Sequence, residues 1–179
     1  MPAAVGPRGW WTGPVRIETP RVVLAPLDVD EWRAVAELDR TGRAWAADYP
    51  TEGDVVIAGL VIAGMASPPT EQEPWGPFQV RERDAGLAIG GAGFKGPPDV
   101  DGCVEIGYGL APSARGRGYA REAVRALCDL AVARGARAVT AETDVGNGAS
   151  ERVLEACGFA VVERKGAMTY WRWEPVSRG

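Results

Sequence analysis

The feature that most constrains the fold is a short loop, Arg115-Gly116-Arg117-Gly118-Tyr119-Ala120, set between an expected strand and an expected helix. The apolar pattern predicts the strand over residues 103–110 and the helix over about residues 116–134. One face of that helix is apolar at helical spacing and must be buried: it is formed by Ala120, Ala123, Val124, Leu127, Leu130 and Ala131. A strand, a loop and a buried helix in this order predict a mixed α/β fold.

The rest of the chain continues the mixed pattern without an internal repeat or a linker. Further strands are expected over residues 17–27, 78–83, 87–95, 136–143, 159–163 and 168–173, and further helices after Asp28, after Thr51 and over residues 147–157. We therefore expect a sheet of about seven strands flanked by about four helices, in a single domain over residues 15–175. Residues 1–14 are expected to be a flexible arm, in which Trp10 and Trp11 dock on the body or on a second subunit.

Two of the expected helices begin at favourable N-cap residues, Asp28 and Thr51, whose side chains can accept hydrogen bonds from the first turn. The second of these helices is apolar nearly all round over residues 55–65. Such a helix is buried, shared with a partner or lining a groove, so a homodimer is one expectation.

The loop has the properties of an anion-binding site. The first backbone N–H groups of a helix lack partners within the helix, and they lie where the helix dipole is positive. Gly116 and Gly118 keep side chains away from these amides, while Arg115 and Arg117 add charge and donors. The spacing is neither that of a dinucleotide fingerprint nor that of a P-loop. The alternative is an ordinary glycine-containing helix start with surface arginines.

The strand before the loop strengthens the case for a ligand. Glu105, Gly107 and Gly109 alternate on one face, and the larger apolar residues occupy the other. Glycines inside a strand indicate that something approaches the backbone closely. We expect a slot for a thin, extended ligand with the Glu105 carboxylate at its far end, unless a β-bulge changes the facing.

Composition excludes several classes of chemistry. The chain has no histidine, which removes Ser-His-Asp and Cys-His catalysis and most zinc sites, and we expect no metal. Cys103, Cys128 and Cys157 show neither metal-ligand nor disulfide spacing, so we expect buried thiols in a reducing, cytoplasmic compartment. The net charge of −4 argues against a nucleic-acid partner. No membrane span or signal peptide is expected.

At this point the residues resemble the GNAT superfamily of acyl-CoA N-acetyltransferases. The family's pyrophosphate signature, Gln/Arg-x-x-Gly-x-Gly/Ala, matches residues 115–120. Its second signature, an Asn before a short helix and Gly-Phe, matches Asn147 and Gly158-Phe159. Ser150 within an Asn-x-x-Ser pattern, together with residues 18–24 and 105–108, is similar to the Rim-like branch, which includes acetylases of ribosomal-protein N-termini. The likeness covers residues 16–173.

The resemblance implies a twisted, mostly antiparallel GNAT-type sheet that splays apart after the strand ending near Leu110. Acetyl-CoA enters the split, with its pantetheine arm along the sheet edge. The residues that would bind it are Leu110, Arg115, Gly116, Arg117, Gly118, Tyr119, Ala120 and Asn147. Asn147 is equally a plain N-cap residue, and both roles are compatible.

The implied reaction is direct attack of an amine on the thioester, without an acyl-enzyme. Glu105 is the candidate base, with a structural ion pair as its alternative. A backbone N–H near Tyr108 would stabilise the oxyanion, an effect worth roughly 3 kcal/mol. Many family members carry a tyrosine as the acid where this chain has Leu154, so Ser150 or a water is the candidate proton donor, and Ser150 is equally a first-turn residue of the helix. Tyr108, Tyr119 and Tyr170 are further hydroxyls that the sequence does not rank.

The acceptor amine is not fixed by the sequence. A peptide or protein N-terminus and a small amine share this chemistry, and a succinyl donor is also possible. The acceptor groove is expected around Trp45, Tyr49, residues 55–65 and Trp75. The alternative from another class is a non-catalytic CoA-binding sensor or structural subunit.

Overall fold

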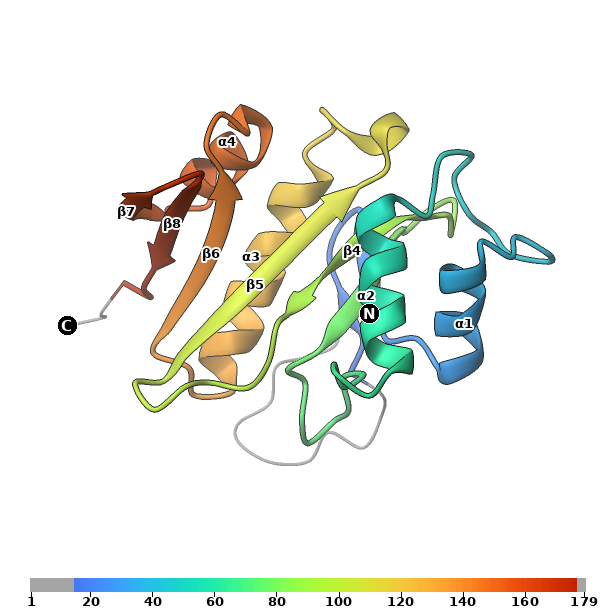
Figure 1. The fold of residues 1–179 in the computed structure, drawn as a ribbon, viewed down its shortest axis with the longest axis horizontal. Helices are drawn as coiled ribbons and strands as arrows, with labels where there is room; N and C mark the ends of the chain where they lie inside the picture. Colours follow the sequence, from blue (N-terminus) through green and yellow to red (C-terminus); the bar gives the residue numbers. More distant parts are fainter. Residues whose placement is uncertain (1–14, 177–179) are drawn as a thin grey trace.

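The chain folds around one eight-stranded sheet, and this computed structural model describes residues 15–176. The strand order is β1-β2-β3-β4-β5-β6-β8-β7 (Figure 1). The strands are β1 (Ile17–Glu18), β2 (Val22–Ala25), β3 (Pro77–Glu82), β4 (Ala88–Phe94), β5 (Cys103–Leu110), β6 (Ala138–Asp144), β7 (Ala160–Lys165) and β8 (Met168–Trp173). All neighbours are antiparallel except β5 and β6, which confirms the predicted mixed, mostly antiparallel sheet. The predicted N-terminal arm and its two tryptophans lie outside the described residues.

The eighth strand comes from a segment that was expected to be one strand. Residues 17–27 instead form the hairpin β1–β2, which turns at Thr19-Pro20-Arg21. The Thr19 backbone N–H donates to the Val22 carbonyl at 3.0 Å, and the Thr19 hydroxyl accepts from the Val22 N–H at 3.1 Å. Pro20 has no N–H to continue a ladder, so the chain reverses here.

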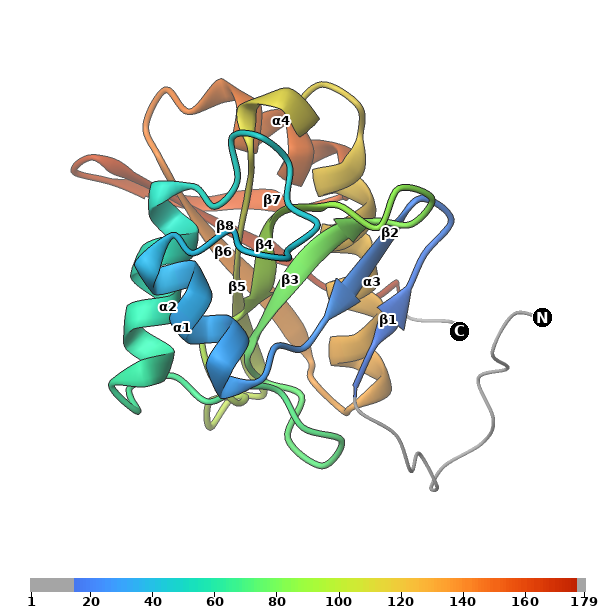
Figure 2. The same cartoon turned by 90° about the vertical axis from the view of Figure 1, so that its right-hand side faces the viewer.

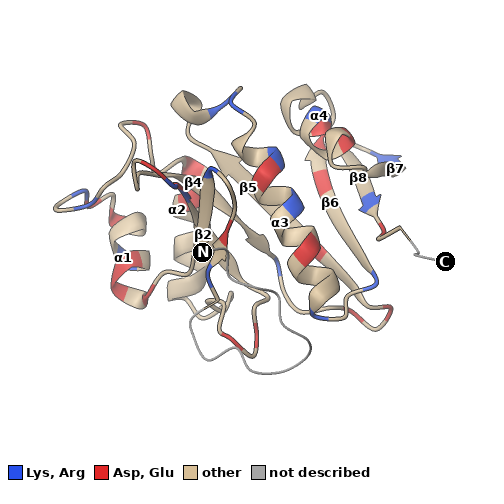
Figure 3. Cartoon of the chain, turned by 180° about the vertical axis from the view of Figure 1, so that it is seen from behind, with Lys and Arg blue, Asp and Glu red and all other residues tan. Residues whose placement is uncertain are grey.

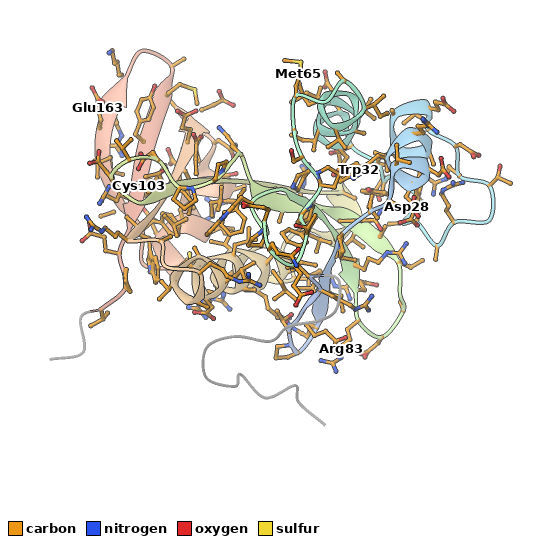
Figure 4. The ribbon with its side chains drawn as sticks, turned by 90° about the horizontal axis from the view of Figure 1, so that it is seen from below. Asp28, Trp32, Met65, Arg83, Cys103 and Glu163 are labelled. Atoms are coloured by element: carbon orange, nitrogen blue, oxygen red, sulfur yellow. The ribbon has the colours of Figure 1, made fainter. Side chains whose placement is uncertain are left out.

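Two helices cover each face of the sheet. Helices α1 (Val29–Glu37) and α2 (Glu52–Ile62) lie on one face, and α3 (Tyr119–Ala133) lies on the other with α4 (Gly148–Ala156) beside it (Figure 2). Asp28 caps α1 by accepting from the Glu31 N–H at 2.8 Å, and Thr51 caps α2, as predicted. The buried Trp32 of α1 lies between these two helices and the sheet (Figure 4).

Helix α3 buries most of the predicted face, because Ala123, Val124, Leu127 and Ala131 have no exposed surface. Helix α2 buries Ala58 and Val61 and leaves Val56, Ile57 and Ile62 exposed, with Met65 exposed just beyond its end (Figure 4). The helix ends at Ile62, before the predicted residue 65, and the chain then turns through Gly64, which has φ +69°.

The sheet splays between β5 and β6, as the family resemblance implied. Their parallel pairing is confined to Cys103–Ile106 and Ala138–Ala141. Beyond that point the two strands diverge (Figure 1), β6 stays paired with β8, and residues 107–110 stay paired with β4 alone. One edge of β5 therefore offers backbone groups to the gap.

Candidate active site at the splay of the sheet

Two adjoining cavities occupy the splay. The larger, about 720 Å³, lies among the end of β5, the following loop, the first turn of α3 and one side of α4. The smaller, about 180 Å³, lies between the diverging ends of β5 and β6. Tyr108, Asn147 and Ser150 line both, so the cavities meet at these residues.

Every residue that the sequence analysis expects to bind the cofactor lines the larger cavity. Its lining includes Leu110, Arg115, Gly116, Arg117, Gly118, Tyr119, Ala120 and Asn147. These residues come from three elements that the splay and the β5–α3 connection bring together. The sequence motifs therefore converge on one surface.

The start of α3 exposes backbone amides to this cavity. Gly118, in the left-handed region with φ +81°, is the N-cap residue and supplies no side-chain cap. Gly116 has φ +72°, so both glycines are needed for the path of the loop. Within residues 15–176, no group accepts a hydrogen bond from the backbone N–H groups of residues 116–121. Unpaired amides at a helix N-terminus favour an anion.

Arginine side chains surround these amides. The larger cavity is lined by Arg21, Arg115, Arg117, Arg121 and Arg152, and by no acidic residue of the described part of the chain. Figure 3, in which basic residues are blue and acidic residues red, shows blue segments in the β5–α3 loop, α3 and α4, together with red segments on both helices. Such a field attracts a polyphosphate although the whole chain carries a net charge of −4.

The two loop arginines are held by protein groups rather than left free. Arg115 Nε donates to the Leu110 carbonyl at 2.9 Å, and Arg117 Nη1 donates to Glu82 Oε1 at 2.7 Å. Sequence reasoning missed the Glu82 contact. Arg121 and Arg152 make no side-chain hydrogen bond or ion pair with the rest of the described chain, so these two guanidinium groups remain available to an anion.

The glycine face of β5 is open. A Cβ added to Gly107 or Gly109 would meet nothing within 4 Å. Gly107 lines the smaller cavity and Gly109 the larger, so the open strip connects the two. This is the space in which the sequence predicted a thin, extended ligand.

The carboxylates are arranged differently from the expectation. Glu105 forms an ion pair with Lys95 Nζ and lines neither cavity. Glu142 Oε2 lies 3.6 Å from the same Lys95 Nζ, and both Glu142 and Lys95 line the smaller cavity. Burial disfavours the charge on Lys95, but hydrogen bonds and charges from Glu105 and Glu142 outweigh it and raise the pKa of Lys95.

Sequence reasoning missed Glu142, because no local pattern marks it as a site residue. Thr140, Glu142 and Asp144 alternate along β6, and Thr140 is paired with Glu105. A parallel partner strand in that register places Glu142 next along the same face. Only the pairing of the two strands, which is not visible in the sequence, makes the position significant.

Tyr108 and Ser150 lie where the cavities meet. Tyr108 Oη donates to the Ser150 carbonyl at 3.0 Å. Burial raises the pKa of the Tyr108 phenol, so it keeps its proton at neutral pH. Asn147 Oδ1 accepts from the Ser150 N–H at 3.2 Å, which confirms its role as the N-cap of α4. Leu154 is fully buried.

The aromatic residues expected in an acceptor groove belong to the core instead. Trp45 and Tyr49 are buried and pack edge to face at 5.3 Å, and the Tyr49 hydroxyl accepts from Gln79 Nε2 at 2.9 Å. Trp75 packs on Phe94 at 5.1 Å. None of these residues, and none of α2, lines either cavity, because aromatic rings also serve as core.

The thiols are less uniformly buried than expected. Cys128 is buried, whereas Cys103 and Cys157 are partly exposed. Burial raises the pKa of Cys128 and of Cys157, which disfavours a thiolate nucleophile at either. Among residues 15–176 no three His, Cys, Asp or Glu side chains cluster in a way that would hold a metal ion. In the same residues, every helix is too short or too polar to span a bilayer.

Comparison with known proteins identifies the family. An acetyltransferase (GNAT) domain matches residues 21–160. The uncharacterized N-acetyltransferase YjdG of Bacillus subtilis (strain 168) is 34% identical over 84 residues, which cover 46% of this chain and 50% of that protein. The alignment thus spans half the length of this curated relative.

Solved structures share the fold at lower identity. A putative ribosomal-protein-serine acetyltransferase from Vibrio cholerae superposes with a TM-score of 0.63 at 17% identity, covering 89% of this chain and 97% of the other. RimL, a ribosomal L7/L12 α-N-protein acetyltransferase solved with coenzyme A, gives 0.61 at 17% identity, covering 89% and 97%. These structures show a shared fold, and the domain match over most of the chain establishes that it belongs to the GNAT acetyltransferase family.

Proposed function

We propose that this protein transfers an acetyl group from acetyl-CoA to a primary amine by direct attack. One observation carries the proposal: a basic groove with unpaired helix amides leads, past Tyr108 and Ser150, into a small cavity that contains the Glu142 carboxylate. A polyphosphate donor fits the first part, and an amine acceptor fits the second.

The groove fits coenzyme A in three respects. Its diphosphate would accept hydrogen bonds from the amides of residues 116–121, and Arg121 and Arg152 would face its phosphates. The pantetheine arm would run over the open strip at Gly107 and Gly109 and pair with the free edge of β5 near Leu110. Bound acetyl-CoA supplies the activated acyl group, and the chain's own residues position it.

The acceptor amine must lose a proton before it attacks, since a lysine amine has a pKa of about 10.4 and an α-amine about 8. We assign this task to the carboxylates that share Lys95: Glu142 faces the cavity and accepts the proton through water, and Glu105 holds Lys95 in place. This modifies the sequence-based assignment, in which Glu105 itself was the base.

The transition state then needs hydrogen-bond donors at two atoms, the thioester carbonyl oxygen and the leaving sulfur. A backbone N–H on the free edge of β5 would stabilise the thioester oxyanion, at roughly 3 kcal/mol for a well-placed donor. The hydroxyl of Ser150 would donate to the leaving thiolate, and Tyr108 would hold the Ser150 segment. No covalent intermediate on the chain is required.

A peptide or protein N-terminus is our first acceptor class, because RimL and the Vibrio cholerae protein are described as ribosomal-protein acetyltransferases. The decisive experiment follows thiol release from acetyl-CoA in the presence of peptides with varied N-termini and of small amines, with mass spectrometry of each product. Acetylated product from at least one amine is expected. Binding of coenzyme A without release for every acceptor would contradict turnover and favour the sensor alternative.

A further inference from the structure

We propose that Arg21 is a positioning residue that holds the Gly116–Gly118 part of the loop in the shape that receives the donor's diphosphate. This proposal rests on the proposed function and adds a residue from outside the loop motif. Arg21 belongs to the β1–β2 turn, far from the loop in sequence, yet it lines the larger cavity.

Arg21 reaches the loop and the helix at once. Its Nη1 donates to the Arg117 carbonyl at 2.8 Å. Its Nε donates to Glu122 Oε2 at 2.9 Å, and its backbone N–H donates to Glu122 Oε1 at 2.7 Å. The guanidinium also lies 5.3 Å from the centroid of the Tyr119 ring. One side chain thus joins the β1–β2 turn, the loop and the first turn of α3.

Glu122 anchors this arrangement. Its Oε1 also accepts from the Thr19 hydroxyl at 2.5 Å, so the carboxylate holds the turn by two bonds and Arg21 by a third. Burial disfavours the charge on Glu122, but the bonds from Thr19 and Arg21 outweigh burial and lower the pKa of Glu122. The carboxylate therefore stays ionised and keeps Arg21 oriented at neutral pH.

The contact at the Arg117 carbonyl controls an amide of the site. The Arg117 C=O and the Gly118 N–H belong to one planar trans peptide and point in opposite directions. Fixing the oxygen therefore fixes the direction of the Gly118 N–H. Arg117 is flanked by two glycines at positive φ, which leave the backbone flexible. Without the bond from Arg21, the loop would adopt many conformations, and ordering it on binding would cost entropy.

The Arg117 side chain is pinned separately. Glu82 Oε1 accepts from Arg117 Nη1 at 2.7 Å and from the Tyr119 hydroxyl at 2.9 Å, and the Arg117 guanidinium lies 4.8 Å from the Tyr119 ring centroid. The loop is thus held through both its main chain and its side chain before any ligand arrives. Preorganisation of this kind raises affinity by reducing the ordering that binding requires.

The test compares coenzyme A binding by calorimetry in the wild type, Arg21→Ala, Arg21→Lys and Glu122→Gln, with a thermal melt of each protein. Arg83→Ala is the matched control, because Arg83 Nη1 donates at 2.9 Å to the carbonyl of Thr19, which lies in the same turn as Arg21. Arg83 lies at the outer edge of the molecule (Figure 4) and lines neither cavity. Glu122→Gln keeps an oxygen for Thr19 and the Arg21 N–H but loses the acceptor for Arg21 Nε.

Arg21→Ala, Arg21→Lys and Glu122→Gln are each expected to raise the Kd for coenzyme A by about tenfold, equivalent to ~1.4 kcal/mol, while Arg83→Ala leaves it within about twofold. In turnover the loss should appear in KM for acetyl-CoA and not in kcat, and it should vanish with acetyl-pantetheine, which has no diphosphate.

Glu122→Gln is the most discriminating variant, because the positioning role predicts weaker binding of coenzyme A and the change of charge alone predicts tighter binding. Removing a carboxylate near an anion should tighten binding. Unchanged or tighter binding by folded Glu122→Gln would overturn the positioning role while leaving the proposed function intact. Failure of the wild type to bind coenzyme A would overturn both.

Discussion

Gly93 and Gly107 lie directly opposite each other in β4 and β5, yet only Gly107 has open space beside it. A Cβ on Gly93 would lie 2.5 Å from the Gly76 carbonyl oxygen, whereas a Cβ on Gly107 would meet nothing within 4 Å. The packing of the fold explains the first glycine and leaves the second unexplained. The empty strip beside Gly107 is therefore evidence for a ligand that occupies it.

We predict that Gly107→Val leaves the free energy of unfolding within about 0.5 kcal/mol of the wild type, because the side chain enters open space. It should nevertheless abolish acetyl transfer by filling the path of the pantetheine arm. Urea unfolding and thiol release measure the two effects. Gly93→Val is the matched control and should fail to fold or lose several kcal/mol through overpacking. Full activity of Gly107→Val would contradict the proposed path.

The carboxylate pair around Lys95 gives a prediction about catalysis. Glu142→Gln should lower kcat by about 10²–10⁴, since it removes the group that accepts the proton. Glu105→Gln should lower kcat less, because it leaves the Glu142 carboxylate in the smaller cavity. Measurements of kcat for both variants at one pH test this, and the reverse ranking would restore Glu105 as the base.

The bond from Tyr108 Oη to the Ser150 carbonyl ties β5 to α4 across the splay. Tyr108→Phe should lower the free energy of unfolding by about 1 kcal/mol, because it leaves the carbonyl without this partner. Turnover should fall by less than about tenfold, because the phenol holds its proton more tightly than a thiol with a pKa of about 8.5.

Ser150→Ala keeps the carbonyl and removes only the hydroxyl. It should leave stability unchanged and lower kcat by about tenfold, the loss of one hydrogen bond to a charged group. Thermal melts and kcat for the two variants separate the roles. A larger loss of kcat in Tyr108→Phe than in Ser150→Ala would identify Tyr108 as the proton donor.

The buried carboxyl of Asp54, in the first turn of α2, should make the free energy of unfolding depend on pH. Burial raises its pKa above the ordinary 3.8, against the opposing hydrogen bonds from Thr51. The folded state then binds the proton more tightly than the unfolded state, so stability falls as the pH rises from the ordinary to the raised value.

Asp54→Asn should remove this fall and stabilise the protein at neutral pH, because the amide oxygen still accepts from Thr51. Urea midpoints from acid to neutral pH test this, with the exposed Asp30→Asn as the control. An unchanged pH slope in Asp54→Asn would contradict the assignment.

Local patterns predicted most of the fold. The caps at Asp28 and Thr51, the apolar face of α3 and the alternation of β5 all act within a few residues, and the structure contains each of them. The division of residues 17–27 into β1 and β2 was not predicted. It depends on Thr19, whose hydroxyl accepts from the Val22 N–H and donates to the distant Glu122.

The phosphate loop was predictable because its residues are consecutive, whereas the acid–base site was not. Lys95, Glu105 and Glu142 come from separate segments and meet only when β5 pairs with β6. The position of Trp45, which the sequence analysis expects in an acceptor groove, was not predictable for the same reason. A buried aromatic ring and a ligand-binding ring have the same sequence signature, and only tertiary contacts distinguish them.

In the proposed function, the backbone amides of residues 116–121 hold the diphosphate of the donor. An amide-resolved NMR titration of the folded protein with coenzyme A tests this directly. We predict saturable shifts for the N–H resonances of Gly116 through Arg121 that are larger than those of residues elsewhere in α3, and much smaller shifts when acetyl-pantetheine replaces coenzyme A. Resonances of residues 116–121 that stay in place at saturating coenzyme A would contradict the account.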